Sequence, residues 1–136
     1  MKKYTDLVAE CLTEVREIMP WDLADRLGQA DAPLLLDVRN PDEWQIASIN
    51  GAIKIALPQV QMAAQQIAYF GKPREETLLA QVPTDQPVVV HCHHGARSEY
   101  AIMILREVGY DAANLINLEG GIDAWSAEAD PTTPRY

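Results

Sequence analysis

Apolar runs alternate with helically spaced apolar positions along most of the chain. Residues 34–38 (LLLDV) and 88–91 (VVVH) are nearly continuous apolar runs bounded by turn residues, which is typical of strands buried on both faces of a sheet. Weaker runs predict further strands at 15–18, on the sheet edge, and at 53–56 and 113–117. Helical spacing predicts helices over 5–13, 20–27, 59–69, 73–80, 98–108 and 121–128. This alternation predicts an α/β fold, in which a parallel sheet carries helices on both faces.

The length of 136 residues suits a single domain with a sizeable core. We expect that core to span residues 15–136 and residues 1–14 to form a helical extension. Residues 70–87 contain three prolines and many polar side chains, so this connection is expected to be the most irregular or mobile part. Trp21 and Trp125 are expected to be core anchors.

The charge balance excludes some partners. Eleven Lys and Arg residues against 20 Asp and Glu residues give a net charge of −9, which disfavours nucleic acid and anionic membranes. Acidic residues follow the first lysines too closely for a secretory signal, so we expect a cytoplasmic protein. Cys11 and Cys92 are the two cysteines and build no disulfide framework. Cys11 falls on an apolar helical stripe and is interpreted as a core residue.

Cys92 stands where chemistry is expected. It ends a buried strand and precedes a loop that enters a helix at about Arg97 or Ser98. Sites in parallel α/β sheets form beyond the carboxyl ends of strands. The reactive form of cysteine is the thiolate, and a helix N-terminus, successive loop N–H groups and the Arg97 cation all favour that anion. We therefore interpret Cys92 as a nucleophile.

Two other interpretations of this segment remain open. Cys92 as an inert core thiol is disfavoured because a polar, His-rich loop follows it. A metal site built from His91, Cys92, His93 and His94 is disfavoured because contiguous residues at a strand end point in alternating directions. His93 and His94 are then either solvent-facing loop residues or contacts at the entrance that influence substrate choice.

Several blocks together resemble the rhodanese (sulfurtransferase) family over residues 18–136. These are LLLDVRNPDEW, INGAI, the loop HCHHGARS, and NLINLEGGIDAW. The resemblance implies a rhodanese-like domain with a five-stranded, mostly parallel sheet and helices on both faces. It makes Cys92 the catalytic residue. It also implies that the N–H groups of the active-site loop surround the sulfur; this loop consists of His93, His94, Gly95, Ala96 and Arg97. Ala47-Ser48-Ile49 departs from the Gly-His-Ile of many members, and the connection between about residues 59 and 86 is longer than in the smallest members.

The length of the loop implies the type of chemistry. Four residues separate Cys92 from Arg97. Dual-specificity phosphatases of the same fold have one residue more, and the shorter loop is associated with sulfur transfer. The resemblance implies that Cys92 takes the outer sulfur of thiosulfate, holds it as a covalent persulfide without another cofactor or a metal, and passes it to cyanide or a thiol. Arg97 would bind the anionic donor or hold the shape of the loop.

Other residues are given supporting roles. Ser98 supports the start of the helix. Asp37 and Arg39 end the neighbouring strand within reach of the loop, and structural ion pairing is favoured over catalysis for them. Glu43 and Trp44 are also interpreted as structural. Glycines 95, 120 and 121 are expected to meet backbone requirements such as a positive φ or close packing.

Three hypotheses of function follow. The first is a thiosulfate sulfurtransferase acting on a small anionic donor and a thiophilic acceptor. The second is a protein-to-protein sulfur relay, because the ending DAWSAEADPTTPRY resembles rhodanese modules that work with adenylating enzymes in thiocarboxylate-forming pathways. The third is a non-catalytic interaction domain, which the presence of Cys92 in a complete loop disfavours.

Overall fold

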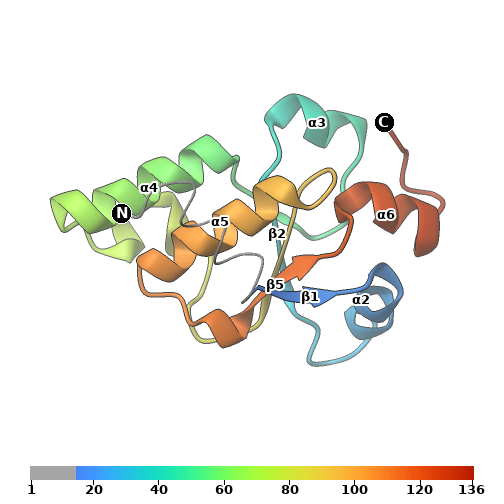
Figure 1. Ribbon diagram of the computed structural model, residues 1–136, viewed down its shortest axis with the longest axis horizontal. Helices are drawn as coiled ribbons and strands as arrows, with labels where there is room; N and C mark the ends of the chain where they lie inside the picture. Colours follow the sequence, from blue (N-terminus) through green and yellow to red (C-terminus); the bar gives the residue numbers. More distant parts are fainter. Residues whose placement is uncertain (1–14) are drawn as a thin grey trace.

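In the part of the chain that the structure describes, five short strands form one sheet in the order β1-β5-β4-β2-β3, and all neighbouring strands are parallel. Strands β1, β2 and β5 are labelled in Figure 1. The computed structural model describes residues 15–136, so the helix predicted over 5–13 and Cys11 lie outside the described residues. The strands are β1 (Arg16–Ile18), β2 (Leu34–Asp37), β3 (Ile53–Lys54), β4 (Val88–His91) and β5 (Leu115–Leu118). The predicted α/β fold with a five-stranded parallel sheet is confirmed.

Helices connect the strands and cover both faces of the sheet. The α-helices are α2 (Pro20–Leu27), α3 (Pro41–Ile46), α4 (Leu57–Phe70), α5 (Ala96–Glu107) and α6 (Gly121–Glu128). Three 3-10 turns are η1 (Arg74–Glu76), η2 (Leu78–Gln81) and η3 (Ala112–Asn114). Most predicted helices lie within a few residues of these bounds.

Alternate residues of the central strands pack into two separate cores. In β4, Val88 and Val90 belong to the cluster under α4 and α5, whereas Val89 belongs to the cluster under α2 and α6. Leu36 and Leu35 of β2 divide in the same way. Successive side chains on a strand point to opposite faces, so a strand apolar at every position requires a helical layer on each side.

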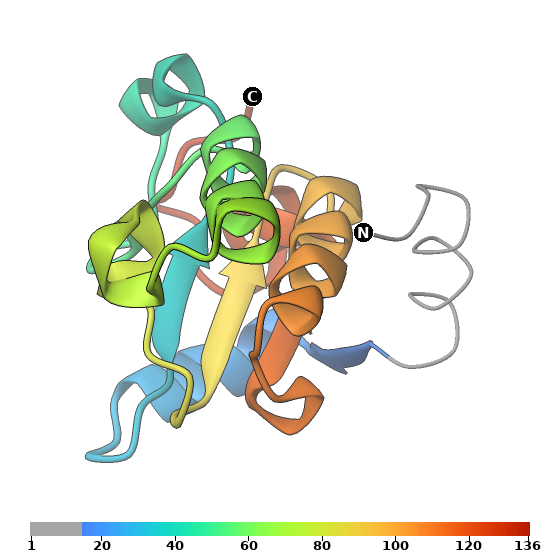
Figure 2. The same ribbon diagram turned by 90° about the vertical axis from the view of Figure 1, so that its left-hand side faces the viewer.

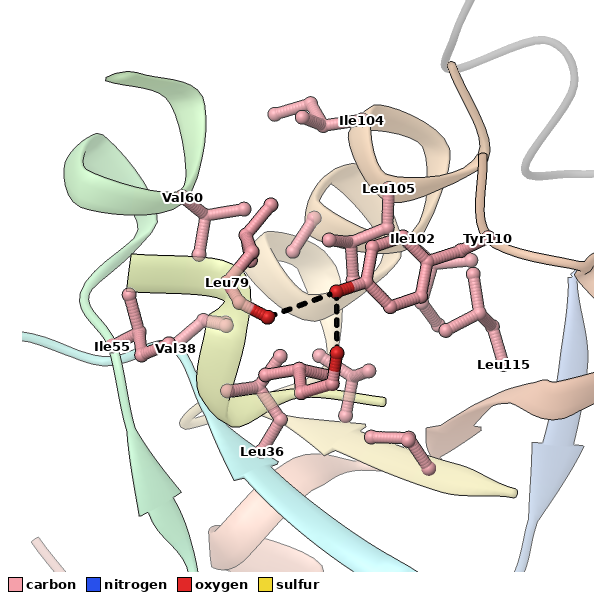
Figure 3. Close-up of a cluster of buried hydrophobic side chains, with 14 of the residues drawn as sticks. Leu36, Val38, Ile55, Val60, Leu79, Ile102, Ile104, Leu105, Tyr110 and Leu115 are labelled. Atoms are coloured by element: carbon pink, nitrogen blue, oxygen red, sulfur yellow. Dashed lines mark hydrogen bonds between the residues drawn. The ribbon is translucent and has the colours of Figure 1, made fainter. Parts of the chain in front are cut away.

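The larger core lies beneath α4 and α5, which run side by side across one face of the sheet (Figure 2). The connection after α4 closes the open end of this core. Tyr110 donates its hydroxyl to the carbonyl oxygens of Leu79, at 3.3 Å, and Val82, at 2.6 Å, and the Leu79 side chain is fully buried (Figure 3). Residues 70–87 are therefore irregular, as predicted, yet they contribute to the core.

Two predictions about local structure are wrong. Residues 73–80 form η1 and η2 instead of one helix, because the Thr77 side chain accepts from the N–H of Leu79 and donates to the carbonyl of Arg74, which competes with helical hydrogen bonds. Trp21 is 51% exposed and is not a core anchor, since α2 buries Pro20 and Leu23 on its other side. Trp125 is buried as expected.

The ends of β2 and β4 bring two functional segments together. Asp37 pairs in register with His91, so the residues that follow each strand emerge side by side. The N–H of Val38 donates to the carbonyl of His91 at 3.1 Å, which continues the ladder by one step. Cys92 and Arg39 thus leave the same edge of the sheet, where sites form in parallel α/β folds.

His91 is a buried polar residue without a hydrogen bond on its ring. Its side chain is fully buried, and neither ring nitrogen has a hydrogen-bond partner. Burial lowers its pKa from the ordinary value of 6.5; Asp37, whose carboxylate lies 3.8 Å from Nε2, opposes this shift, and Arg39 reinforces it. His91 is therefore neutral in the native protein at neutral pH.

The lowered pKa of buried His91 predicts that the protein loses stability in mild acid. The unfolded chain binds a proton on residue 91 below about pH 6.5, whereas the native state does not, so stability decreases as the pH falls below that value. Between pH 7.5 and pH 5.5 this group is expected to lower the free energy of unfolding, measured in urea, by on the order of 1 kcal/mol. His91→Leu should remove that loss, whereas His94→Leu, at a position 68% exposed, should retain it. A His91→Leu protein with the full acid-dependent loss would contradict the assignment.

Candidate active site

The loop between β4 and α5 places Cys92 at the start of a helix. Cys92 directly follows β4, and α5 begins at Ala96, slightly before the predicted entry at Arg97 or Ser98. Gly95 precedes the helix and has a backbone φ of 108°, which residues other than glycine rarely adopt. This tight turn directs the N–H of Gly95 toward the cysteine.

The Cys92 sulfur lies among polar groups although the residue is only 1% exposed. The N–H of Gly95 donates to Sγ at 3.1 Å, and the Ser98 hydroxyl oxygen lies 3.4 Å from Sγ. A backbone N–H, a hydroxyl and a helix N-terminus are groups that stabilise a sulfur anion. This arrangement differs from that of a thiol surrounded by apolar side chains alone.

Ser98 is held in place by a residue that the sequence analysis missed. Its Oγ donates to Asn117 Oδ1 at 2.5 Å and also lies 3.1 Å from the Gly95 carbonyl oxygen. A serine hydroxyl has one proton, so with this proton on Asn117 the oxygen is free to accept from the Cys92 thiol. Rotation of the hydroxyl would present the proton to a thiolate. The one sequence signal for Asn117 is a polar residue within the apolar run of β5.

The N-terminus of α6 supports the other side of the loop. Ile122 and Asp123 donate their N–H groups to the carbonyl oxygens of Cys92, at 2.9 Å, and His93, at 3.1 Å. A Cβ on Gly121 would lie 2.6 Å from the Cys92 carbonyl oxygen and would also collide with the His93 carbonyl. Gly121 has a φ of 63° as well, so the predicted backbone requirement is confirmed and close approach is its physical reason.

Arg97 is paired with Glu43 of α3. Nη1 lies 2.6 Å from Oε1 and Nη2 lies 2.9 Å from Oε2, a bidentate contact across 54 positions of sequence. The hydrogen bond from Arg97 is the largest cause that lowers the pKa of Glu43 to about 2; burial opposes it. Glu43 also raises the pKa of Arg97, so both groups are charged at neutral pH. Sequence reasoning assigned Glu43 a structural role and did not indicate this partner.

Tyr136 also reaches the site. Its hydroxyl donates to Glu43 Oε2 at 2.7 Å and accepts from Arg39 Nη1 at 2.8 Å, and its ring stacks on His93 with centroids 4.0 Å apart. Burial and the Glu43 carboxylate raise the pKa of Tyr136 to about 12, against the effect of Arg39. The end of the chain accordingly lies next to α3 (Figure 1). No motif in the sequence pointed to this residue.

Asp37 and Arg39 form a fully buried ion pair. Arg39 Nη2 lies 2.7 Å from Asp37 Oδ2, and the same nitrogen donates to the Ala47 carbonyl at 2.7 Å. Arg39 thereby ties the end of β2 to the segment that follows α3. This pair braces the part of the chain that carries Glu43.

The remaining loop residues face solvent or a small pocket. His94 is exposed, with Nδ1 3.9 Å from an Asp123 oxygen. A pocket of about 190 Å³ is lined by Leu57, Ala96, Arg97 and Tyr100.

Within residues 15–136, no group of three or more His, Cys, Asp or Glu side chains is arranged to hold a metal ion. In the same part of the chain no helix has the length and apolarity needed to cross a membrane.

Known proteins resemble this chain in sequence and in fold. The family model described as Rhodanese-like domain matches residues 19–128. A protein named Sulfurtransferase from Allochromatium vinosum is 30% identical over 117 residues, which cover 86% of this chain and 94% of that protein. The crystal structure of a rhodanese-related protein from Thermoplasma volcanium superposes with a TM-score of 0.60 at 28% identity, covering 84% of this chain and 93% of that one.

A longer relative carries the same domain within a larger protein. "Probable adenylyltransferase/sulfurtransferase MoeZ" of Mycobacterium tuberculosis is 32% identical over 119 residues, which cover 88% of this chain but only 26% of MoeZ. The chain therefore spans about a quarter of the length of that relative. From the fold, the loop around Cys92 and these matches together, the chain belongs to the rhodanese-like domain family of sulfurtransferases.

Proposed function

We propose that this protein transfers a sulfane sulfur through a persulfide on Cys92. The observation that carries the proposal is the setting of Cys92 Sγ, 3.1 Å from the Gly95 N–H and 3.4 Å from the Ser98 hydroxyl oxygen at the start of α5. A persulfide anion extends the same sulfur by one atom, so the same groups favour the thiolate and the loaded intermediate. The short loop, with four residues between Cys92 and Arg97, also supports sulfur chemistry.

With thiosulfate as the donor, the reaction has two halves. The Cys92 thiolate attacks the outer sulfur, the bond between the two sulfur atoms of thiosulfate breaks, and sulfite leaves with the electron pair. A thiophilic acceptor such as cyanide or a thiolate then attacks the outer sulfur of the persulfide and restores the Cys92 thiolate. No cofactor beyond the covalent persulfide is required.

A protein-to-protein relay is the second candidate. The similarity to MoeZ, whose name joins adenylyltransferase and sulfurtransferase, favours a donor or acceptor that is itself a protein. In that case Cys92 would receive its sulfur from a protein persulfide, and the turnover of thiosulfate would be incidental. A non-catalytic interaction domain would instead keep its partner after Cys92→Ser.

Loading of Cys92 tests the persulfide directly. Incubation of the reduced protein with thiosulfate should add one sulfur atom, about 32 Da, to Cys92, and cyanide should release it as thiocyanate. Intact mass and peptide mapping measure both steps. Cys92→Ser should abolish loading and turnover while the melting temperature changes little, because the oxygen replaces sulfur in a similar volume. Full turnover by the serine variant would refute Cys92 as the nucleophile.

Substitution of the two arginines should separate a role in donor binding from a structural role. Arg97→Ala is expected to raise the thiosulfate KM about tenfold or more, because it removes a cation next to Cys92 and leaves Glu43 unpaired. Arg39→Ala is expected to cost about 3–5 kcal/mol in unfolding free energy, because Asp37 is left as a buried, unpaired charge. Steady-state kinetics and urea unfolding measure these effects, and equal KM changes in the two variants would contradict the assignment.

A further inference from the structure

The guanidinium fork of Arg97, formed by Nη1 and Nη2, already binds a carboxylate. Nη1 and Nη2 each hold one oxygen of the Glu43 carboxylate, at 2.6 Å and 2.9 Å. Bidentate binding is also the way in which arginine recognises the oxygens of a small oxyanion. A sulfur donor that uses this fork must therefore displace Glu43 or be bound beside a carboxylate.

Several contacts hold Glu43 where it is. Oε1 accepts from the N–H of Asn40 at 3.2 Å in the capping box of α3, and Oε2 accepts from the Tyr136 hydroxyl at 2.7 Å. The Glu43 side chain is 14% exposed and that of Arg97 is 33% exposed, so solvent screens the pair only in part. Release of Arg97 from Glu43 would break a well-supported contact.

Each of the two arginines described at this site is matched by a carboxylate. Arg97 is paired with Glu43, and Arg39 is paired with Asp37 at 2.7 Å. The pocket beside the loop has Arg97 among its lining residues, and the other three are Leu57, Ala96 and Tyr100. This side of the site therefore offers little net positive charge to a dianion such as thiosulfate.

We propose that Glu43 determines donor specificity: by holding Arg97 it disfavours dianionic thiosulfate and directs Cys92 toward sulfane donors of lower negative charge, namely the persulfides of thiols. This inference rests on the sulfur-transfer function proposed above. In such a reaction the Cys92 thiolate attacks the outer sulfur of R–S–S–H and the S–S bond breaks. The electron pair and the proton go to the R–S fragment, which leaves as R–SH. Glu43 acts through Arg97 and is a positioning residue.

Glu43→Gln tests this proposal with two donors that differ by one charge. Gln keeps a side-chain oxygen for the Asn40 N–H, so α3 retains its cap. Thiosulfate is a dianion and ethanethiosulfonate is a monoanion, and both deliver a terminal sulfur from an oxidised sulfur leaving group. We expect kcat/KM to rise about tenfold for thiosulfate and about threefold for ethanethiosulfonate, because electrostatic energy is proportional to the charge of the donor.

Asp42→Asn is the matched control. Asp42 is exposed one residue earlier on α3, and its substitution changes the net charge by the same amount. Its kcat/KM values should stay within about twofold of the unmodified protein for both donors. Tyr136→Phe removes one hydrogen bond to Glu43 and should change the ratio of the two kcat/KM values in the same direction as Glu43→Gln, by a smaller factor.

The outcomes distinguish this inference from the function on which it rests. Equal factors for the two donors in Glu43→Gln, or no change in either, would overturn the role of Glu43 while Cys92 still gained about 32 Da. Absence of that gain with both donors, and also with the persulfide of a small thiol, in every variant would overturn sulfur transfer itself. A melting temperature unchanged by Glu43→Gln would show that the kinetic change does not come from partial unfolding.

Discussion

The N-terminal ends of α5 and α6 both lie against the Cys92 loop, and each contacts different backbone groups of that loop. Gly95, directly before α5, donates its N–H to the sulfur, and the N–H groups of Ile122 and Asp123 in α6 donate to the carbonyls of Cys92 and His93. A loop with N–H groups turned inward must turn carbonyls outward, and buried carbonyls need partners. The close approach of α6 depends on Gly121, because a Cβ there would meet the loop backbone. The sulfur site therefore depends on a glycine in another part of the sequence.

The charges around this loop explain how an acidic protein could carry the anionic intermediate proposed for Cys92. The net charge of −9 opposes any anion at long range. Backbone N–H groups and a helix terminus add a local positive potential without a mobile cation. Arg97 and Arg39, by contrast, are each tied to a carboxylate. The site thus favours a negative charge on the sulfur more than it favours additional negative charge on a bound donor.

The sequence predicted the parts of this site that follow from local pattern. Apolar runs identified β2, β4 and β5 because strands buried on both faces are apolar at most positions, and the end of β4 located Cys92. The pairing of Arg97 with Glu43 joins residues 54 positions apart, and the contact of Tyr136 with Glu43 joins residues 93 positions apart. Such contacts depend on how α3 and the end of the chain pack, which no periodicity reports. The incorrect interpretation of Trp21 has a similar origin, because an aromatic residue does not reveal which side of α2 faces the sheet.

The partner of Arg97 also bears on the choice between sulfur and phosphate chemistry. Phosphoryl transfer needs an arginine that can form bidentate hydrogen bonds to the equatorial oxygens of a phosphate. Here that fork binds Glu43, and the Glu43 carboxylate would repel a phosphate dianion placed at Arg97. The spacing of four residues between Cys92 and Arg97 is a separate argument from the sequence, independent of this ion pair, and it also favours sulfur transfer. Because the fold itself is compatible with both chemistries, the loop length and the occupied arginine are the features that favour sulfur.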